Sequence, residues 1–271
     1  MVEEKREEKG PGPELPKGAH PSFLNTIKQK ERIREKLSKI RHKIGVYSAK
    51  GGVGKTTTAV NIAFTLSRKG FRVGLLDADI DCPNVTMFLG MEDAKMEPVM
   101  PLQPLTKEGV KVASTAMLVD EIKRPIIWRG PLVAKMIGDF LENTEWGELD
   151  YLIVDLPPGT SDSPLSIMQL LKLDGFVIVT TPQRIACINS IRSGMMAKRL
   201  GVSILGIVEN MSDRKASRNT EEVAKSLETE LIGVVPMQQR LATLADEGKV
   251  PVLSEDEFYA VYGKIVDRLP R

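Results

Sequence analysis

The stretch from Ser48 to Thr58, SAKGGVGKTTT, constrains this chain more than any other feature of its sequence. It follows the β-prone run of residues 44–47 and opens a helical pattern with one apolar face, for which Gly70 is the expected stop. In a strand, glycine-rich turn and helix of this kind, backbone N–H groups point at phosphate oxygens, at the positive end of the helix dipole. The stretch therefore predicts a phosphate-binding loop.

The general pattern for such a loop is G-x-x-x-x-G-K-[ST]. Gly54, Lys55 and Thr56 fill its last three positions, and Ala49 replaces the first glycine. Alanine is tolerated there provided that its φ is negative. We expect Lys55 to reach the terminal phosphates and the Thr56 hydroxyl to ligate Mg²⁺. A glycine-rich turn that binds nothing is the alternative, but the strand and the helix that the motif requires are both present.

The composition is that of an ordinary globular protein. At 271 residues, with 42% hydrophobic and 27% charged residues, it suits one α/β domain. The net charge of +2 gives no reason to expect a nucleic-acid partner, and no apolar run approaches the ~20 residues of a membrane helix. The charged N-terminus is not a secretory signal, and two distant cysteines make no disulfide framework. A cytoplasmic protein is the simplest expectation.

Strand-like and helix-like segments alternate along the chain, which predicts an α/β fold with a doubly wound, mostly parallel sheet. Expected strands are residues 44–47, 71–76, 110–112, 151–154, 176–180, 204–208 and 231–235. Expected helices, besides the one after the phosphate loop, are residues 22–41, 131–141, 185–200 and 255–269. We expect a disordered tail (1–21), an N-terminal helix (22–42) and a P-loop ATPase domain (43–271).

Two of these helices allow two interpretations. The N-terminal helix is rich in Lys and Arg, so it either docks an acidic partner or is a solvated helix at the edge of the domain, which we favour. The C-terminal helix either lies on a membrane surface or closes the core. Its acidic start favours the core.

Acidic residues follow two of the expected strands, where doubly wound folds bind their ligands. Asp79 is placed to orient or deprotonate an attacking water, while Asp77 and Asp155 are candidate Mg²⁺ ligands, directly or through water. Capping of neighbouring helices is the structural alternative for any one of the three. Lys50, a second lysine inside the loop, is a candidate for neutralising charge that develops on the phosphates.

Several segments of the chain resemble those of a known family. The segment KGGVGKT from Lys50 to Thr56 is similar to the deviant phosphate loop of the MinD, ParA and nitrogenase iron protein family. Within it, the Mrp/ApbC group of iron–sulfur cluster carrier ATPases is most similar. The resemblance covers nearly everything from Lys43 onwards and rests on these further segments: DADI (77–80), WRGP (128–131), WGELDY (146–151), DLPPGT (155–160) and ENMS (209–212).

The resemblance implies an ATPase, with ATP and Mg²⁺ as cofactors, that works as a homodimer with ATP between the subunits. It makes Lys50 the signature lysine, acting on the neighbouring subunit's nucleotide, and it implies that the Asn210 amide contacts adenine. The implied catalytic residues are Lys50, Lys55 and Asp79. The implied nucleotide-binding residues are Gly51, Gly52, Val53, Gly54, Lys55, Thr56, Thr57 and Asn210. The implied metal ligands are Thr56, Asp77 and Asp155.

One departure separates the chain from that group. Carriers have a CxxC pair soon after the Asn-Met-Ser segment, whereas residues 212–219 here read SDRKASRN, without cysteine. Clusters are usually held by four thiolates, and Cys82 and Cys187 lack chelating spacing. The chain is therefore expected to act in iron–sulfur cluster assembly through unusual ligands or through a cysteine-bearing relative or apo iron–sulfur protein. The alternative is a MinD/ParA-like dimerisation switch without a cluster. A small-molecule kinase would need an acceptor pocket that the sequence does not reveal.

Overall fold

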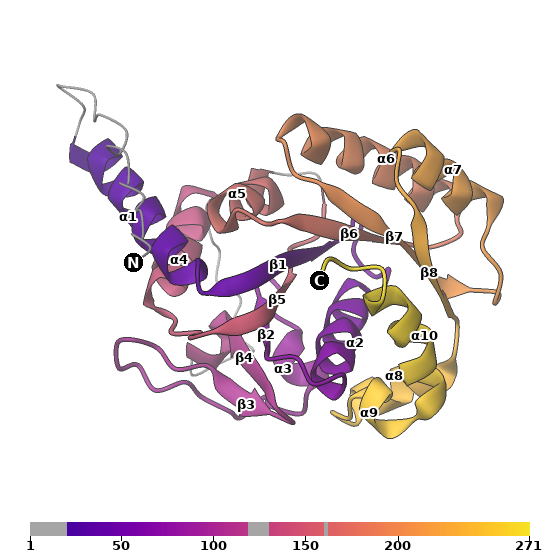
Figure 1. Cartoon of the computed structure of the whole chain (residues 1–271), viewed down its shortest axis with the longest axis horizontal. Helices are drawn as coiled ribbons and strands as arrows, with labels where there is room; N and C mark the ends of the chain where they lie inside the picture. The colour runs from indigo at the N-terminus through magenta and orange to yellow at the C-terminus, as the bar shows by residue number, and fades with distance from the viewer. Residues whose placement is uncertain (1–20, 119–129, 160–161) are drawn as a thin grey trace, which may run out of the picture.

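The computed structural model describes residues 21–118, 130–159 and 162–271. Its strands are β1 (Ile40–Tyr47), β2 (Val73–Asp77), β3 (Leu105–Lys107), β4 (Val110–Ser114), β5 (Leu149–Asp155), β6 (Gly175–Thr180), β7 (Ile204–Ser212) and β8 (Leu231–Pro236). They form one sheet in the order β3-β4-β2-β5-β1-β6-β7-β8 (Figure 1). Every described pair is parallel except β3–β4, so the predicted doubly wound, mostly parallel sheet is confirmed.

The central strands are largely buried because both faces of the sheet are covered. Every residue of β2 and β6 is buried, and in β5 only Asp150 is partly exposed. Parallel strands read as continuous hydrophobic runs for this reason, whereas a sheet open to water on one face would alternate. These runs are what made the strands predictable from the sequence.

Helices cover the sheet on both sides. They are α1 (Pro21–Leu37), α2 (Lys55–Arg68), α3 (Val85–Phe88), α4 (Gly130–Asn143), α5 (Asp162–Leu171), α6 (Arg184–Arg199), α7 (Arg218–Ser226), α8 (Gln239–Asp246), α9 (Pro251–Ser254) and α10 (Asp256–Val266). In Figure 1, α1, α4, α5, α6 and α7 lie on one side of the sheet, and α2, α3, α8, α9 and α10 lie on the other.

The C-terminal helix closes the core, as its acidic start indicated. Phe258 and Ile265 of α10 are fully buried, and α10 packs against α2 and β8. Among the helices of the described residues, none is long and apolar enough to span a bilayer.

The N-terminal helix ends earlier than expected. It stops at Leu37, and residues 40–43 belong to β1, so the expected boundary between residues 42 and 43 falls inside a strand. Pairing explains this, because Ile40 lies opposite Leu149 of β5 and backbone hydrogen bonds in the sheet override a helical pattern. Of the expected disordered tail, only Pro21, the first residue of α1, lies within the described residues.

Contacts of α1 favour the solvated-edge interpretation over a docking helix. Arg32 pairs with Glu142 of α4 at 2.5 Å, and Lys36 lies 3.6 Å from Glu145. On the other side of the helix, Ile33 and Leu37 are buried in the core. Two of its cations therefore have acidic neighbours within this chain.

Candidate nucleotide site

The glycine-rich loop joins the end of β1 to the start of α2, at the carboxyl edge of the sheet. Gly52 and Gly54 have φ values of 78° and 84°, and Gly54 is the N-cap of α2. Only glycine adopts this left-handed region without strain, which explains both residues. Ala49 is not among the described residues with a positive φ, so its methyl group is tolerated.

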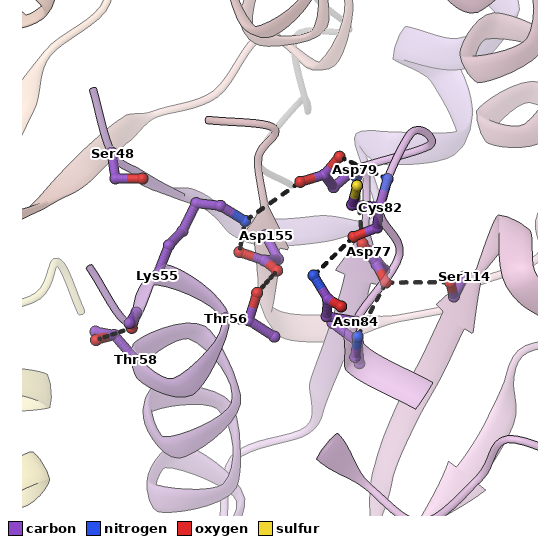
Figure 2. Close-up of polar contacts among 12 residues, drawn as sticks. Ser48, Lys55, Thr56, Thr58, Asp77, Asp79, Cys82, Asn84, Ser114 and Asp155 are labelled. Atoms are coloured by element: carbon purple, nitrogen blue, oxygen red, sulfur yellow. Dashed lines mark hydrogen bonds and ion pairs between the residues drawn. The ribbon is translucent and has the colours of Figure 1, made fainter. Parts of the chain in front are cut away.

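Lys55 lies at the centre of the site and is buried beneath the loop. Its ammonium group is 2.5 Å from Asp155 Oδ1 and 4.0 Å from Asp79 Oδ2. Figure 2 shows the lysine side chain reaching from the start of α2 to these two carboxylates, which follow β5 and β2. The structure thus brings together three residues that lie far apart in the sequence.

The Thr56 hydroxyl completes this group. It donates to Asp155 Oδ2 at 2.6 Å, so one carboxylate holds both the lysine and the threonine that follows it (Figure 2). A hydroxyl and a carboxylate are hard oxygen donors of the kind that Mg²⁺ prefers, and Mg²⁺ usually takes only one or two carboxylates beside substrate phosphates. Thr56 and Asp155 therefore fit an Mg²⁺ ion. Among the residues that the structure describes, no three His, Cys, Asp or Glu side chains form a ready-made metal cage.

Asp77 is fully buried and makes its contacts inside the protein. Its oxygens accept from the backbone N–H of Asp79 at 3.2 Å, from that of Val85 at 3.1 Å and from the Ser114 hydroxyl at 3.2 Å. Burial, followed by the nearby charge of Asp155, raises the pKa of Asp77 to about 8. This carboxyl group thus joins the start of α3 to β4 and to the loop that carries Asp79.

Asp79 lies closer to the surface, with 5% of the residue exposed. Its Oδ1 accepts from the Cys82 backbone N–H at 3.2 Å. Burial raises its pKa to about 6, although the Lys55 ammonium acts in the opposite direction. The side chain can therefore exist as either acid or carboxylate near neutral pH.

Lys50, Gly51 and Gly52 are exposed at the tip of the loop. The Lys50 side chain does not join the group around Lys55. Lys50 forms no ion pair with any residue that the structure describes. Val53 is buried and Thr57 is half-buried beside them.

A pocket of about 170 Å³ lies beside the phosphate loop, where Asn210 and Thr57 meet the segment after β8. Its wall is formed by Thr57, Asn210, Met211, Pro236, Met237, Gln238, Gln239, Leu241, Ala242 and Ala245. The sequence analysis had identified only the first two. Pro236 ends β8 and residues 237–239 directly follow it, so the rule that ligands bind at carboxyl ends of strands is the signal that could have found them.

The Asn210 amide contacts the phosphate loop itself. Its Nδ2 donates to the Val53 carbonyl at 2.8 Å, and a Cβ at Gly54 would lie 2.0 Å from that nitrogen. Gly54 therefore serves a second purpose besides its backbone angle, because it admits Asn210. The adenine contact of Asn210 stays a prediction.

The two cysteines lie in different surroundings. Cys82 is exposed in the loop after β2, whereas Cys187 is buried in α6, where its thiol donates to the Thr181 carbonyl at 3.3 Å. Burial raises the pKa of Cys187, which disfavours the thiolate that a cluster needs. In residues 212–219, the segment without cysteines, the hydroxyls of Ser212 and Ser217 donate to the buried Glu209 carboxylate.

Comparisons with known proteins show the family to which the chain belongs. Residues 39–270 match the family model "ParA: NUBPL iron-transfer P-loop NTPase". The iron–sulfur cluster carrier protein of Methanocaldococcus jannaschii is 42% identical over 255 residues, which cover 89% of this chain and 88% of that protein. The carrier proteins of Synechocystis sp. (40% identical, covering 83% and 68%) and Escherichia coli (37%, covering 86% and 67%) are similar too.

Solved structures give the same result. A nucleotide-binding protein of Archaeoglobus fulgidus in complex with ADP superposes with a TM-score of 0.70 at 35% identity, covering 84% of this chain and 95% of that one. The cell division ATPase MinD of Pyrococcus furiosus has a TM-score of 0.63 at 22% identity, covering 84% and 98%, and shows the fold alone. The resemblance drawn from the sequence motifs is confirmed, and the chain belongs to the family of NUBPL iron-transfer P-loop NTPases.

Proposed function

We propose that this protein binds ATP and Mg²⁺ at the carboxyl edge of its sheet, hydrolyses the ATP, and uses this cycle in iron–sulfur cluster assembly or transfer. The observation that carries the proposal is the contact of Asp155 with both Lys55 and Thr56 beneath a glycine-rich loop. The A. fulgidus structure with ADP and the relatives named as cluster carriers support it.

In this proposal the loop holds the phosphates and Lys55 supplies a positive charge to them. The Lys55 ammonium exchanges its contact with Asp155 for a phosphate oxygen, which frees that carboxylate to face Mg²⁺ beside Thr56. Bound Mg²⁺ would neutralise charge on the phosphates. The pocket at Asn210 and Met237 takes the adenine.

Asp79 acts on the attacking water. Its carboxylate lies 4.0 Å from Lys55, at the site edge, and it is ionised at pH 7 with a pKa of about 6. It therefore orients the water, or accepts its proton, beside the terminal phosphate. Asp77 was expected to ligate Mg²⁺. Its three hydrogen bonds favour a positioning role instead, holding the Asp79 loop.

Iron–sulfur cluster is the proposed cargo, and the whole chain has only two thiols with which to hold it. Cys187 is buried, so only Cys82 is free to contribute a ligand, and two subunits together would still supply two thiolates of the usual four. We therefore propose that the chain acts together with a cysteine-bearing relative or an apo iron–sulfur protein. The alternative of a MinD/ParA-like switch is not favoured, since MinD itself shares only the fold.

ATP turnover of the purified protein, measured with and without Mg²⁺, tests the first part. Wild type is expected to hydrolyse ATP slowly and to lose this activity with EDTA, while Asp79→Ala keeps ATP binding and turns over about a hundredfold more slowly. Asp79→Ala with wild-type turnover would show that the water-orienting role is wrong.

Anaerobic reconstitution with iron and sulfide, followed by visible absorption and iron analysis, tests the second part. We expect no stable cluster on this chain alone. A stoichiometric cluster that is lost in Cys82→Ser would contradict the need for a second protein. The free thiols support a reducing compartment, so we propose the cytoplasm as the location.

A further inference from the structure

Tyr47, the last residue of β1, has a hydroxyl group that the proposed mechanism does not use. The residue is fully buried, and its ring meets the edge of the Phe176 ring, with centroids 5.7 Å apart and planes at 85°. Packing alone would be satisfied by phenylalanine. The tyrosine hydroxyl instead donates to the Gly159 carbonyl at 2.5 Å. Burial raises the pKa of Tyr47, so its hydroxyl keeps the proton that it donates.

Gly159 follows the two prolines of the loop after Asp155. Within residues 156–159, Pro157 and Pro158 have no N–H groups, so only Leu156 and Gly159 can donate from the backbone. Leu156 donates to the Val46 carbonyl at 3.1 Å, and Gly159 donates to the Ser48 carbonyl at 3.0 Å. Every acceptor of these bonds belongs to the end of β1 or to the residue that opens the phosphate loop.

The end of β1 thus holds Gly159 on both sides, through Ser48 at its N–H and Tyr47 at its carbonyl. The φ of Gly159 is 100°, a conformation that glycine adopts readily and other residues do not, so the loop has a defined shape. A shift of Gly159 is transmitted through two rigid prolines and Leu156 to Asp155.

We propose that Tyr47 is a positioning residue for ATP hydrolysis: its hydroxyl fixes Gly159 and thereby positions the Asp155 carboxylate beside Thr56, where the proposed mechanism needs it. This rests on the proposed function, because it assigns Tyr47 a part in that reaction. Errors of about 1 Å in a catalytic arrangement cost up to a hundredfold in rate, so one hydroxyl can matter without touching the nucleotide.

Tyr47→Phe tests the proposal, since it keeps the buried ring and removes one oxygen. Tyr151→Phe is the matched control, because the Tyr151 hydroxyl also donates to a carbonyl, that of Pro270, at 2.7 Å near the C-terminus. We expect Tyr47→Phe to lower kcat about tenfold while KM for ATP stays within about twofold, and Tyr151→Phe to leave both unchanged. Because a partly unfolded sample would also lower the apparent kcat at an unchanged KM, kcat is calculated per folded protein, with the folded fraction measured by circular dichroism.

Amide hydrogen exchange at Gly159, followed by NMR, measures how firmly the loop is held without any turnover, because the Gly159 N–H donates to the Ser48 carbonyl. We expect exchange about tenfold faster in Tyr47→Phe than in wild type, and no change in Tyr151→Phe. Wild-type kcat in Tyr47→Phe would overturn the proposal, as would unchanged exchange. If the wild-type protein hydrolyses no ATP, the proposed function fails, and exchange at Gly159 still decides whether Tyr47 holds the loop.

Discussion

Lys55 provides one positive charge beside three buried carboxyl groups, and this imbalance of charge sets the properties of the site. Its ammonium group neutralises Asp155 directly and lies 4.0 Å from Asp79. Asp77 forms no ion pair with any residue that the structure describes, and burial, followed by the charge of Asp155, raises its pKa to about 8. Three carboxylates would be unstable in this interior without a second cation. A divalent ion beside Thr56 is a natural complement to such a site.

The raised pKa of Asp79 gives a prediction for the pH dependence of catalysis. The ionised form is the one that orients water, and it is lost as pH falls through about 6. We therefore expect kcat/KM to fall about tenfold per pH unit below that value, because kcat/KM reports the free enzyme. An unshifted aspartate would lose activity only near pH 4. Steady-state kinetics between pH 5 and 8 distinguish the two, and a flat profile would remove Asp79 from this role.

Among the elements, the short helix α3 depends on Asp77. This carboxyl group satisfies the first N–H of α3, at Val85, and also bonds Ser114 at the end of β4. It acts as the helix-capping side chain that the sequence left as an alternative for one of the three aspartates.

Asp77→Ala is expected to lower the free energy of unfolding by about 2 kcal/mol, because it leaves buried donors without an acceptor. Ser114→Ala removes only one of these hydrogen bonds and should cost about 1 kcal/mol or less. Urea unfolding followed by circular dichroism measures both. A stability of Asp77→Ala equal to that of wild type would mean that these contacts do not hold α3.

The apolar strands were predictable from the sequence, whereas α3, α5, α7, α8 and α9 were not. The strands were found because burial on both faces makes them continuous hydrophobic runs. α7 and α8 were missed because their exposed sides are polar and only a few residues, such as Val223 and Leu244, reach the core. The start of β1 was read as helix because Ile33, Leu37 and Ile40 fit a helical spacing, whereas the strand pairing of Ile40 is a tertiary effect.

At the site, too, residues in local motifs were predictable and contacts between distant segments were not. Lys55, Thr56 and the aspartates were found because each follows a strand or belongs to a known motif. The contact between Asn210 and Val53 was not, since it joins segments more than a hundred residues apart. No local pattern encodes such a contact, although Gly54 is the residue that permits it.

For the whole molecule, the sheet order explains why the site lies where it does. β1 is flanked by β5 and β6, and the chain crosses to one side of β1 for β2 and β5 and to the other for β6, β7 and β8 (Figure 1). Such a reversal leaves a crevice at the carboxyl ends of the strands, where doubly wound folds bind their ligands. The phosphate loop follows the strand at which the order reverses.

At the same scale, the exposed Lys50 predicts a dimer with ATP between its subunits. Asp79→Ala with Mg²⁺ and ATP should have twice the 29.9 kDa mass of the chain in light scattering, because slow hydrolysis preserves the bound nucleotide. Adding Lys50→Ala should return it to a monomer, since each Lys50 is expected to contact the neighbouring subunit's phosphates. A dimer that persists in the double variant would remove Lys50 from the interface.

ATP affinity of Lys55→Ala, measured by calorimetry with Mg²⁺ beside wild type, tests the assignment of the nucleotide site most directly. Lys225→Ala is the matched control, because it removes an exposed lysine of α7, outside the phosphate loop. We expect Lys55→Ala to bind ATP at least about a hundredfold more weakly, a loss of about 2.7 kcal/mol, and Lys225→Ala to stay within a few fold of wild type. Unchanged affinity in a folded Lys55→Ala protein would show that this loop is not where the nucleotide binds.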